Sequence, residues 1–128
     1  MIVLDTHTWL WWISKPSSLS QSARRRIDRE SRLNISAISC LEIATLVAKG
    51  RISLDRGTLE WLDAALMMPK VDLLPLTPPI AAKASLLGNN FPGDPADRTI
   101  AATALLESAP LVTKDARIRD SEVVTTIW

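Results

Sequence analysis

Two kinds of hydrophobic pattern alternate along the chain. Short aliphatic runs, typical of strands buried on both faces of a parallel sheet, are separated by longer stretches with apolar residues at helical spacing. We predict strands at 1–4, 33–36, 71–76, 110–113 and 122–127. Pro75 has no N–H to donate to a sheet ladder, so the third strand is expected near an edge of the sheet.

The segments between these strands carry the start and stop signals of helices. We predict helices at 6–13, 20–30, 39–49, 58–68, 77–88 and 97–106. Ser39 and Glu42 have the spacing of a capping box, and Gly50 follows the last turn of the same helix. Strands that alternate with helices predict one α/β domain over residues 1–128, with three α/β/α layers and a mostly parallel sheet of about five strands.

The composition is that of an ordinary globular protein. The chain has 128 residues, of which 47% are hydrophobic and 23% charged. No apolar run reaches the roughly 18–20 residues needed to span a bilayer, and the first apolar run has no basic lead-in of a signal peptide. The single Cys40 excludes an internal disulfide and a Cys-rich zinc site. We therefore expect a soluble cytoplasmic protein without a membrane partner.

The charge balance constrains any contact with nucleic acid. A net charge of +1 is far below that of a dedicated nucleic-acid binder, so local basic groups or metal ions must supply the positive charge. The run Arg24, Arg25 and Arg26 is interpreted first as a solvated helix face, with RNA contact as the alternative. His7, the only histidine, is expected in a structural or rim position.

Four acids follow predicted strands or begin predicted helices. Asp5 and Asp115 come directly after the first and fourth strands, Glu42 lies in the first turn of the helix after the second strand, and Asp97 begins the helix that leads to the fourth strand. The carboxyl ends of parallel strands and the amino ends of the following helices share one edge, where open α/β sheets bind ligands. We expect the four carboxylates to meet there, with Asp94 close by.

Clustered carboxylates repel one another unless a cation lies between them. Mg²⁺ or Mn²⁺ prefers oxygen ligands, and a metal so held suits the hydrolysis of a phosphodiester. No Ser-His-Asp, Cys-His or Gly-rich phosphate loop competes for this role. Each acid taken singly also has a structural interpretation: Glu42 completes the capping box, Asp97 complements a helix dipole, and Asp115 begins a turn.

The ordered set of short motifs resembles one family from end to end. The matching pieces are Leu4-Asp5-Thr6-His7 with Leu10-Trp11-Trp12, Ser36-Ala37-x-Ser39-x-Leu41-Glu42-Ile43-Ala44, Leu74-Pro75-Leu76-Thr77, Asp94-Pro95-Ala96-Asp97-Arg98-x-Ile100-Ala101-Ala102, and Leu111-Val112-Thr113-Lys114-Asp115. They resemble the PIN-domain family and, within it, the VapC toxins of type II toxin–antitoxin systems.

The resemblance implies a Mg²⁺-dependent endoribonuclease that cuts tRNA, rRNA or mRNA, is inhibited by a cognate VapB-type antitoxin and forms a homodimer. It carries metal-site roles onto Asp5, Glu42, Asp97 and Asp115, with Asp5 and Asp97 as direct ligands. It also implies that Thr113 orients water or a carboxylate. Asp94 stands where this subfamily often has an extra acid.

Several interpretations stay open at this level. Arg98, Lys114 and Arg117 either contact RNA phosphates or pair with the carboxylates. The helix at 9–13, apolar on every side, is either core or part of a groove for a partner segment. Two non-catalytic alternatives are a receiver-like module phosphorylated on aspartate, which the absence of an acid at 74–76 disfavours, and an idle PIN domain that binds a partner.

Overall fold

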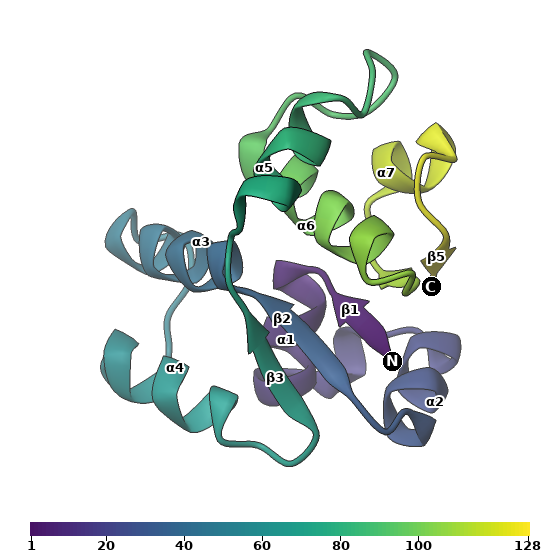
Figure 1. The fold of residues 1–128 in the computed structure, drawn as a ribbon. Helices are drawn as coiled ribbons and strands as arrows, with labels where there is room; N and C mark the ends of the chain where they lie inside the picture. The colour runs from purple at the N-terminus through teal and green to yellow at the C-terminus, as the bar shows by residue number, and fades with distance from the viewer.

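The computed structural model describes residues 1–128 and contains one five-stranded sheet in the order β3-β2-β1-β4-β5 (Figure 1). All four strand pairs are parallel, so the sheet is wholly rather than mostly parallel. The strands are β1 (Ile2–Leu4), β2 (Leu33–Ser36), β3 (Val71–Leu74), β4 (Leu111–Val112) and β5 (Thr126–Ile127). The chain leaves β1 toward β2 on one side and returns to β4 on the other, which makes β1/β4 the switch point at which such sheets bind ligands.

Helices cover both faces of this sheet. They are α1 (Thr6–Ser14), α2 (Gln21–Arg29), α3 (Ala37–Ala48), α4 (Thr58–Leu66), α5 (Pro78–Ser85), α6 (Pro95–Leu106) and α7 (Ala116–Ser121), with a 3-10 turn at Pro16–Ser18. Figure 1 shows α1, α2 and α4 on one side of the sheet and α5, α6 and α7 on the other. This is the expected three-layer α/β/α arrangement.

The alternation of side chains along β1 divides the core into two parts. Ile2 and Leu4 pack with residues of α1 to α4, whereas Val3 packs with residues of α6 and α7. On α6, Ala101, Ala102 and Ala104 are fully buried, and their small side chains let the helix lie close to β1 and β2. Both layers therefore hold β1 rigidly, and with it the residue that follows it.

Three local predictions were wrong. The N-cap of α3 is Ser36 and not Ser39, because the Ser36 hydroxyl accepts from the Ile38 N–H, so Ser39 and Glu42 form no capping box. The fifth strand is only Thr126–Ile127 rather than 122–127, and Glu122 is a left-handed helix end at φ 56°. The six-residue helix α7 was not predicted, since its sequence is too short for a helical period to emerge.

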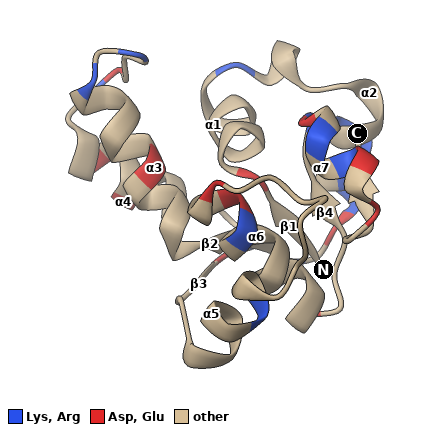
Figure 2. Ribbon diagram, turned by 90° about the horizontal axis from the view of Figure 1, so that it is seen from above, with Lys and Arg blue, Asp and Glu red and all other residues tan.

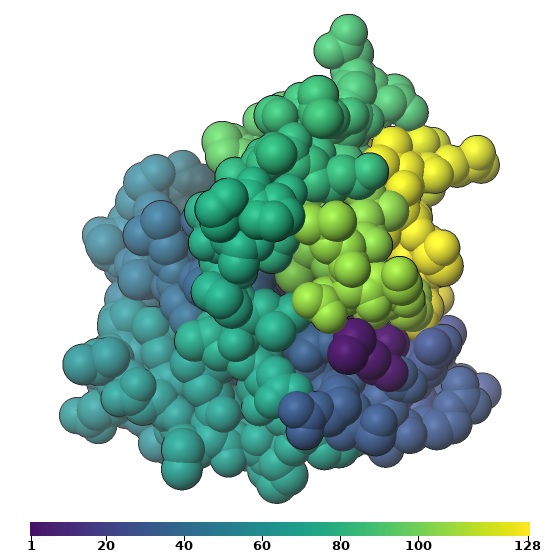
Figure 3. Space-filling model, viewed as in Figure 1, coloured from purple at the N-terminus to yellow at the C-terminus, as the bar shows by residue number.

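The strand predicted near an edge, β3, is an edge strand and ends at Leu74, before Pro75. No helix has the length and apolar character required to cross a membrane. In Figure 3 the N-terminal residues, in purple, emerge beside the yellow-green end of α6, and the green loop that follows α5 projects from the body of the molecule. Polar residues from distant parts of the chain meet at the carboxyl edge of β1 and β4.

Candidate active site

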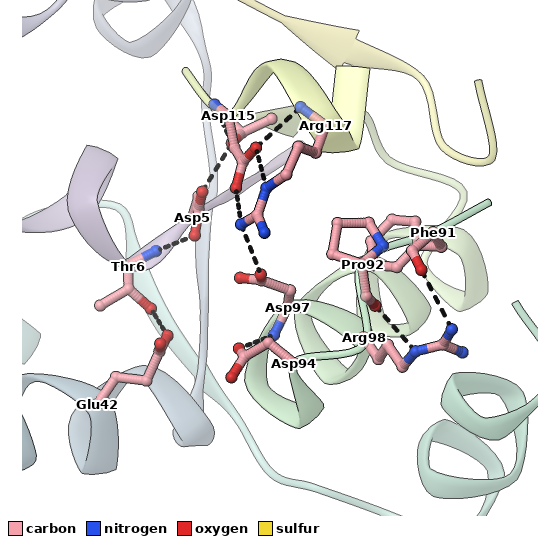
Figure 4. Close-up of polar contacts among 11 residues, drawn as sticks. Asp5, Thr6, Glu42, Phe91, Pro92, Asp94, Asp97, Arg98, Asp115 and Arg117 are labelled. Carbon is pink, nitrogen blue, oxygen red and sulfur yellow. Dashed lines mark hydrogen bonds and ion pairs between the residues drawn. The ribbon is translucent and has the colours of Figure 1, made fainter. Parts of the chain in front are cut away.

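A cleft of about 610 Å³ opens at the carboxyl edge of β1 and β4. Nine residues line it: Asp5, His7, Trp11, Glu42, Asp94, Asp97, Lys114, Asp115 and Arg117. All four acids expected to meet are among them, together with Asp94. Figure 2 shows acidic segments at the β1–α1 junction and at the start of α6 close together, and Figure 4 shows the side chains facing one another.

Asp5 is the most firmly held of these acids. It follows the central strand and is the N-cap of α1, with Oδ1 accepting from the Thr6 N–H at 2.7 Å. Its Oδ2 accepts from the hydroxyl of Thr113 at 2.7 Å, and Thr113 is fully buried at the end of β4. Two donors on rigid elements therefore orient the Asp5 carboxylate at the cleft.

Glu42 is positioned by a buried hydroxyl pair. The Thr6 hydroxyl donates to Glu42 Oε1 and lies 2.8 Å from the Ser39 hydroxyl, which is itself buried on α3. This links the first turn of α1 to the first turns of α3. Glu42 thus faces the cleft through tertiary contacts and takes no part in capping its own helix.

Asp94 and Asp97 come from the beginning of α6. Asp94 is the N-cap, and its Oδ2 accepts from the Asp97 N–H at 3.0 Å. Pro95 stands at the first helical position, where its missing N–H costs no hydrogen bond. The helix therefore begins two residues before the predicted start, and Asp97 lies inside its first turn with its side chain toward Asp5 (Figure 4).

Asp115 is held by an arginine two residues further on. Arg117 donates through Nε and Nη2 to the two oxygens of Asp115, at 3.3 and 3.0 Å, and Nη2 lies 3.9 Å from Asp97 Oδ2. The guanidinium therefore stands between two of the four acids. Of the alternatives left open for Arg117, the structure shows the carboxylate pair.

The other basic residues lie differently. Arg98 turns away from the cleft and donates only to backbone carbonyls, and it pairs with none of the acids (Figure 4). Arg24 and Arg25 are exposed on α2, and Arg26 pairs with Glu30. Arg24 and Arg25 therefore lie on a solvated helix face, and no residue of the arginine run lines the cleft.

Crowding of the acids changes their proton affinity. Burial, followed by the charges of neighbouring acids, raises the pKa of Asp97 from 3.8 to about 7. Burial also raises the pKa of Asp5 and of Glu42, although hydrogen bonds from Thr113 and Thr6 work against it. The Arg117 hydrogen bond lowers the pKa of Asp115. The cleft therefore carries unbalanced negative charge around Asp5, Glu42 and Asp97.

We expect the metal-free protein to lose stability as the pH rises from about 5 to 8. Asp97 releases its proton near pH 4 in the unfolded chain and near pH 7 in the folded one, so the folded state binds more protons between these values. Melting temperatures in EDTA at pH 5 and pH 8 measure the effect. Asp97→Asn removes the titrating group, so its melting temperature is expected to change less over the same interval.

The donor set of the cleft fits a hard divalent cation. Carboxylate oxygens are the ligands that Mg²⁺ and Mn²⁺ prefer, and a cation between Asp5, Glu42 and Asp97 would relieve the repulsion that adds to the effect of burial on their pKa values. In this structure no three His, Cys, Asp or Glu side chains converge closely enough to enclose an ion. A bound ion would therefore require these side chains to move closer together.

The sequence did not predict two features of the cleft. Trp11 lines it, although the helix at 9–13 was read as core or partner groove, and the hydroxyls of Thr6 and Ser39 position Glu42. The only sequence signal for Trp11 was its spacing of four residues from His7, which places both on one helix face. The hydroxyl pair joins residues 33 apart in sequence, which local pattern does not reveal.

Comparisons with known proteins agree with this architecture. Residues 2–123 match the family model of the PIN domain. The chain is 42% identical over 129 aligned positions to Ribonuclease VapC22 from Mycobacterium tuberculosis, covering 99% of this chain and 98% of that protein.

Solved structures with the same fold come from toxin–antitoxin complexes. The chain superposes with a TM-score of 0.72 on a chain of VapBC2 from Rickettsia felis bound to promoter DNA, at 19% identity and over 98% of this chain and 97% of that one. DNA-bound VapBC from Salmonella typhimurium gives a TM-score of 0.70 at 20% identity, covering 98% and 97%. At these identities the likeness establishes the fold.

Proposed function

This chain belongs to the PIN-domain family, among its VapC-type members, and we propose that it is a Mg²⁺- or Mn²⁺-dependent endoribonuclease, the toxin of a toxin–antitoxin pair. The observation that carries the proposal is the meeting of Asp5, Glu42, Asp97 and Asp115 in one cleft, from four separate parts of the chain. The name of the relative VapC22, a ribonuclease, supports RNA as the substrate.

In this proposal Asp5 and Asp97 would hold the metal, and Mg²⁺ or Mn²⁺ bound there would supply Lewis acidity for phosphodiester hydrolysis. Thr113 keeps the Asp5 carboxylate aimed at the cleft through its hydroxyl. Loss of a hydrogen-bond donor to a metal-binding side chain usually lowers metal affinity or activity about 10–100-fold.

Glu42 and Asp115 surround the reacting phosphate in the proposed arrangement. The Thr6 hydroxyl occupies one oxygen of Glu42 and leaves the other without a protein donor, so that oxygen is available to take a proton from the attacking water. Arg117 orients Asp115 and places a positive charge at the rim of an acidic cleft, where a polyanionic substrate must enter.

The partner proposal rests on the solved relatives. The Rickettsia felis and Salmonella typhimurium structures are VapBC complexes, and this supports a VapB-type antitoxin for the present chain. We also propose a homodimer as the form of the free toxin. The substrate class is tRNA, rRNA or mRNA.

The test is cleavage of purified tRNA, rRNA and mRNA by the purified chain. We expect cleavage with Mg²⁺ or Mn²⁺, none with EDTA, and recovery when the metal is returned. Asp63→Asn, an exposed acid on α4 outside the cleft, is the control that should cut like the wild type. A folded protein that binds an antitoxin and cuts none of these RNAs with either metal would instead be an idle partner-binding domain.

A further inference from the structure

A partly buried tryptophan, Trp11, packs against the hydrophobic core and also lies among the polar side chains of the cleft. Trp11 is the one apolar residue of the nine that line the cleft. Its neighbours Trp9 and Leu10 are buried in the core, at 0% and 8% exposure, whereas Trp11 is only half-buried. A large aromatic ring beside five carboxylates is a feature that packing alone does not require.

The indole is held in place by other rings. His7 lies one helical turn away with its ring centroid 5.7 Å from that of Trp11, and the ring of Trp128, the residue after β5, lies 6.0 Å away. Both rings are tilted against the indole, by 52° and 57°. Trp11 is therefore a fixed aromatic surface rather than a free side chain.

A lysine stands over the same ring. Lys114 Nζ lies 5.7 Å from the Trp11 centroid, and this exposed side chain makes no salt bridge. Arg117, the other long basic side chain of the cleft, already forms ion pairs with Asp115 and Asp97. Lys114 is thus the basic side chain of the cleft that is free to bind a phosphate. It lies over the face of the indole that is turned toward the cleft.

We propose that Trp11 and Lys114 form a nucleotide subsite that receives an unpaired base of the RNA next to the cleaved phosphodiester. The base stacks on the indole face now under Lys114, and the ammonium moves onto a flanking phosphate. Stacking of a base on an aromatic ring outweighs an exposed cation–π contact, so the exchange is favourable. The inference rests on the proposed function, and it assigns to Trp11 and Lys114 the contact with one unpaired nucleotide, whose base is free to stack.

The test measures binding of a fluorescein-labelled ten-nucleotide oligouridylate by anisotropy, with every variant in an Asp97→Asn background so that the RNA stays intact. Trp11→Leu is expected to weaken the Kd about tenfold, in the range for loss of one base–aromatic stack. Trp12→Leu, the same change at the next residue outside the cleft, is the matched control and should stay within twofold of the parent.

The role of Lys114 is tested separately by the salt dependence of RNA binding, a measurement that does not require a folded tryptophan variant. Lys114→Gln should lower the slope of log Kd against log salt by about 0.7, the value for one single-strand phosphate contact, and Lys83→Gln on α5 should leave it unchanged. Trp11→Leu protein that melts like its parent and binds within twofold of it overturns the proposal, as does an unchanged slope for Lys114→Gln. If either of these results is obtained while the wild-type protein still cleaves RNA, the nucleotide subsite is refuted and the proposed nuclease function is not.

Discussion

Asp97→Asn is expected to reduce RNA cleavage at least roughly a thousandfold while making the metal-free protein more stable. The amide keeps the size of the side chain but cannot contribute a charge to a bound cation, and such a cation supplies several kcal/mol of transition-state stabilisation. The same carboxylate is the one whose pKa is raised to about 7 by burial and by the surrounding acids. Without a bound metal, the charged form of Asp97 therefore lowers the stability of the folded state.

Cleavage rates and melting temperatures together measure this prediction. At pH 8 in EDTA, we expect Asp97→Asn to melt roughly 3–6 °C above the wild type, the shift that corresponds to about 1 kcal/mol in a domain of this size. Added Mg²⁺ should raise the melting temperature of the wild type and leave that of the variant almost unchanged. Asp63→Asn is the control for both measurements. Loss of stability together with normal cleavage would show that Asp97 is only a helix-dipole residue.

The elements that the sequence predicted well are those with strong local signals. The aliphatic run before Asp5 became the central strand, and β3, which ends at Leu74 directly before Pro75, lies at the edge of the sheet as predicted. The errors lie where tertiary contacts decide. Ser39 carries the pattern of a helix cap, but its hydroxyl meets Thr6 from a distant helix, and Ser36 caps α3 instead.

The candidate site was predictable because topology places it. In a parallel sheet, the residues directly after the strands reach the same edge, so Asp5 and Asp115 were expected at one edge once the strands were identified. They come close together because β1 and β4 are neighbours in the sheet, a strand order that the sequence did not predict. The orientation of each side chain was not predictable. Arg98 adjoins Asp97 in sequence yet turns to the opposite side, whereas Arg117 from the unpredicted helix α7 reaches both Asp97 and Asp115.

Arg98→Ala is expected to destabilise the protein by about 2–4 kcal/mol, because a charged hydrogen-bond donor to several acceptors would be lost at a partly buried position. Its guanidinium donates to the carbonyl oxygens of Pro92, Ala84, Gly88 and Phe91, at 2.7 to 3.3 Å, and lies 5.9 Å over the Phe91 ring. These contacts fasten the end of α5 and the loop at 88–93 to the first turn of α6. Chemical denaturation at pH 7 measures the loss.

The same loop carries the chain into Asp94 and Asp97, so the effect should reach the cleft. Without Arg98 the amino end of α6 is less well fixed, and we expect the Mg²⁺ concentration needed for half-maximal cleavage to rise as well. Arg119→Ala, an exposed arginine on α7 without a side-chain hydrogen bond, controls for the loss of one positive charge. Equal denaturation midpoints for Arg98→Ala and Arg119→Ala would mean that the four carbonyls are satisfied by water equally well. We expect Arg98→Ala to be the more destabilising of the two variants, because it also removes the contact of the guanidinium with the buried Phe91 ring.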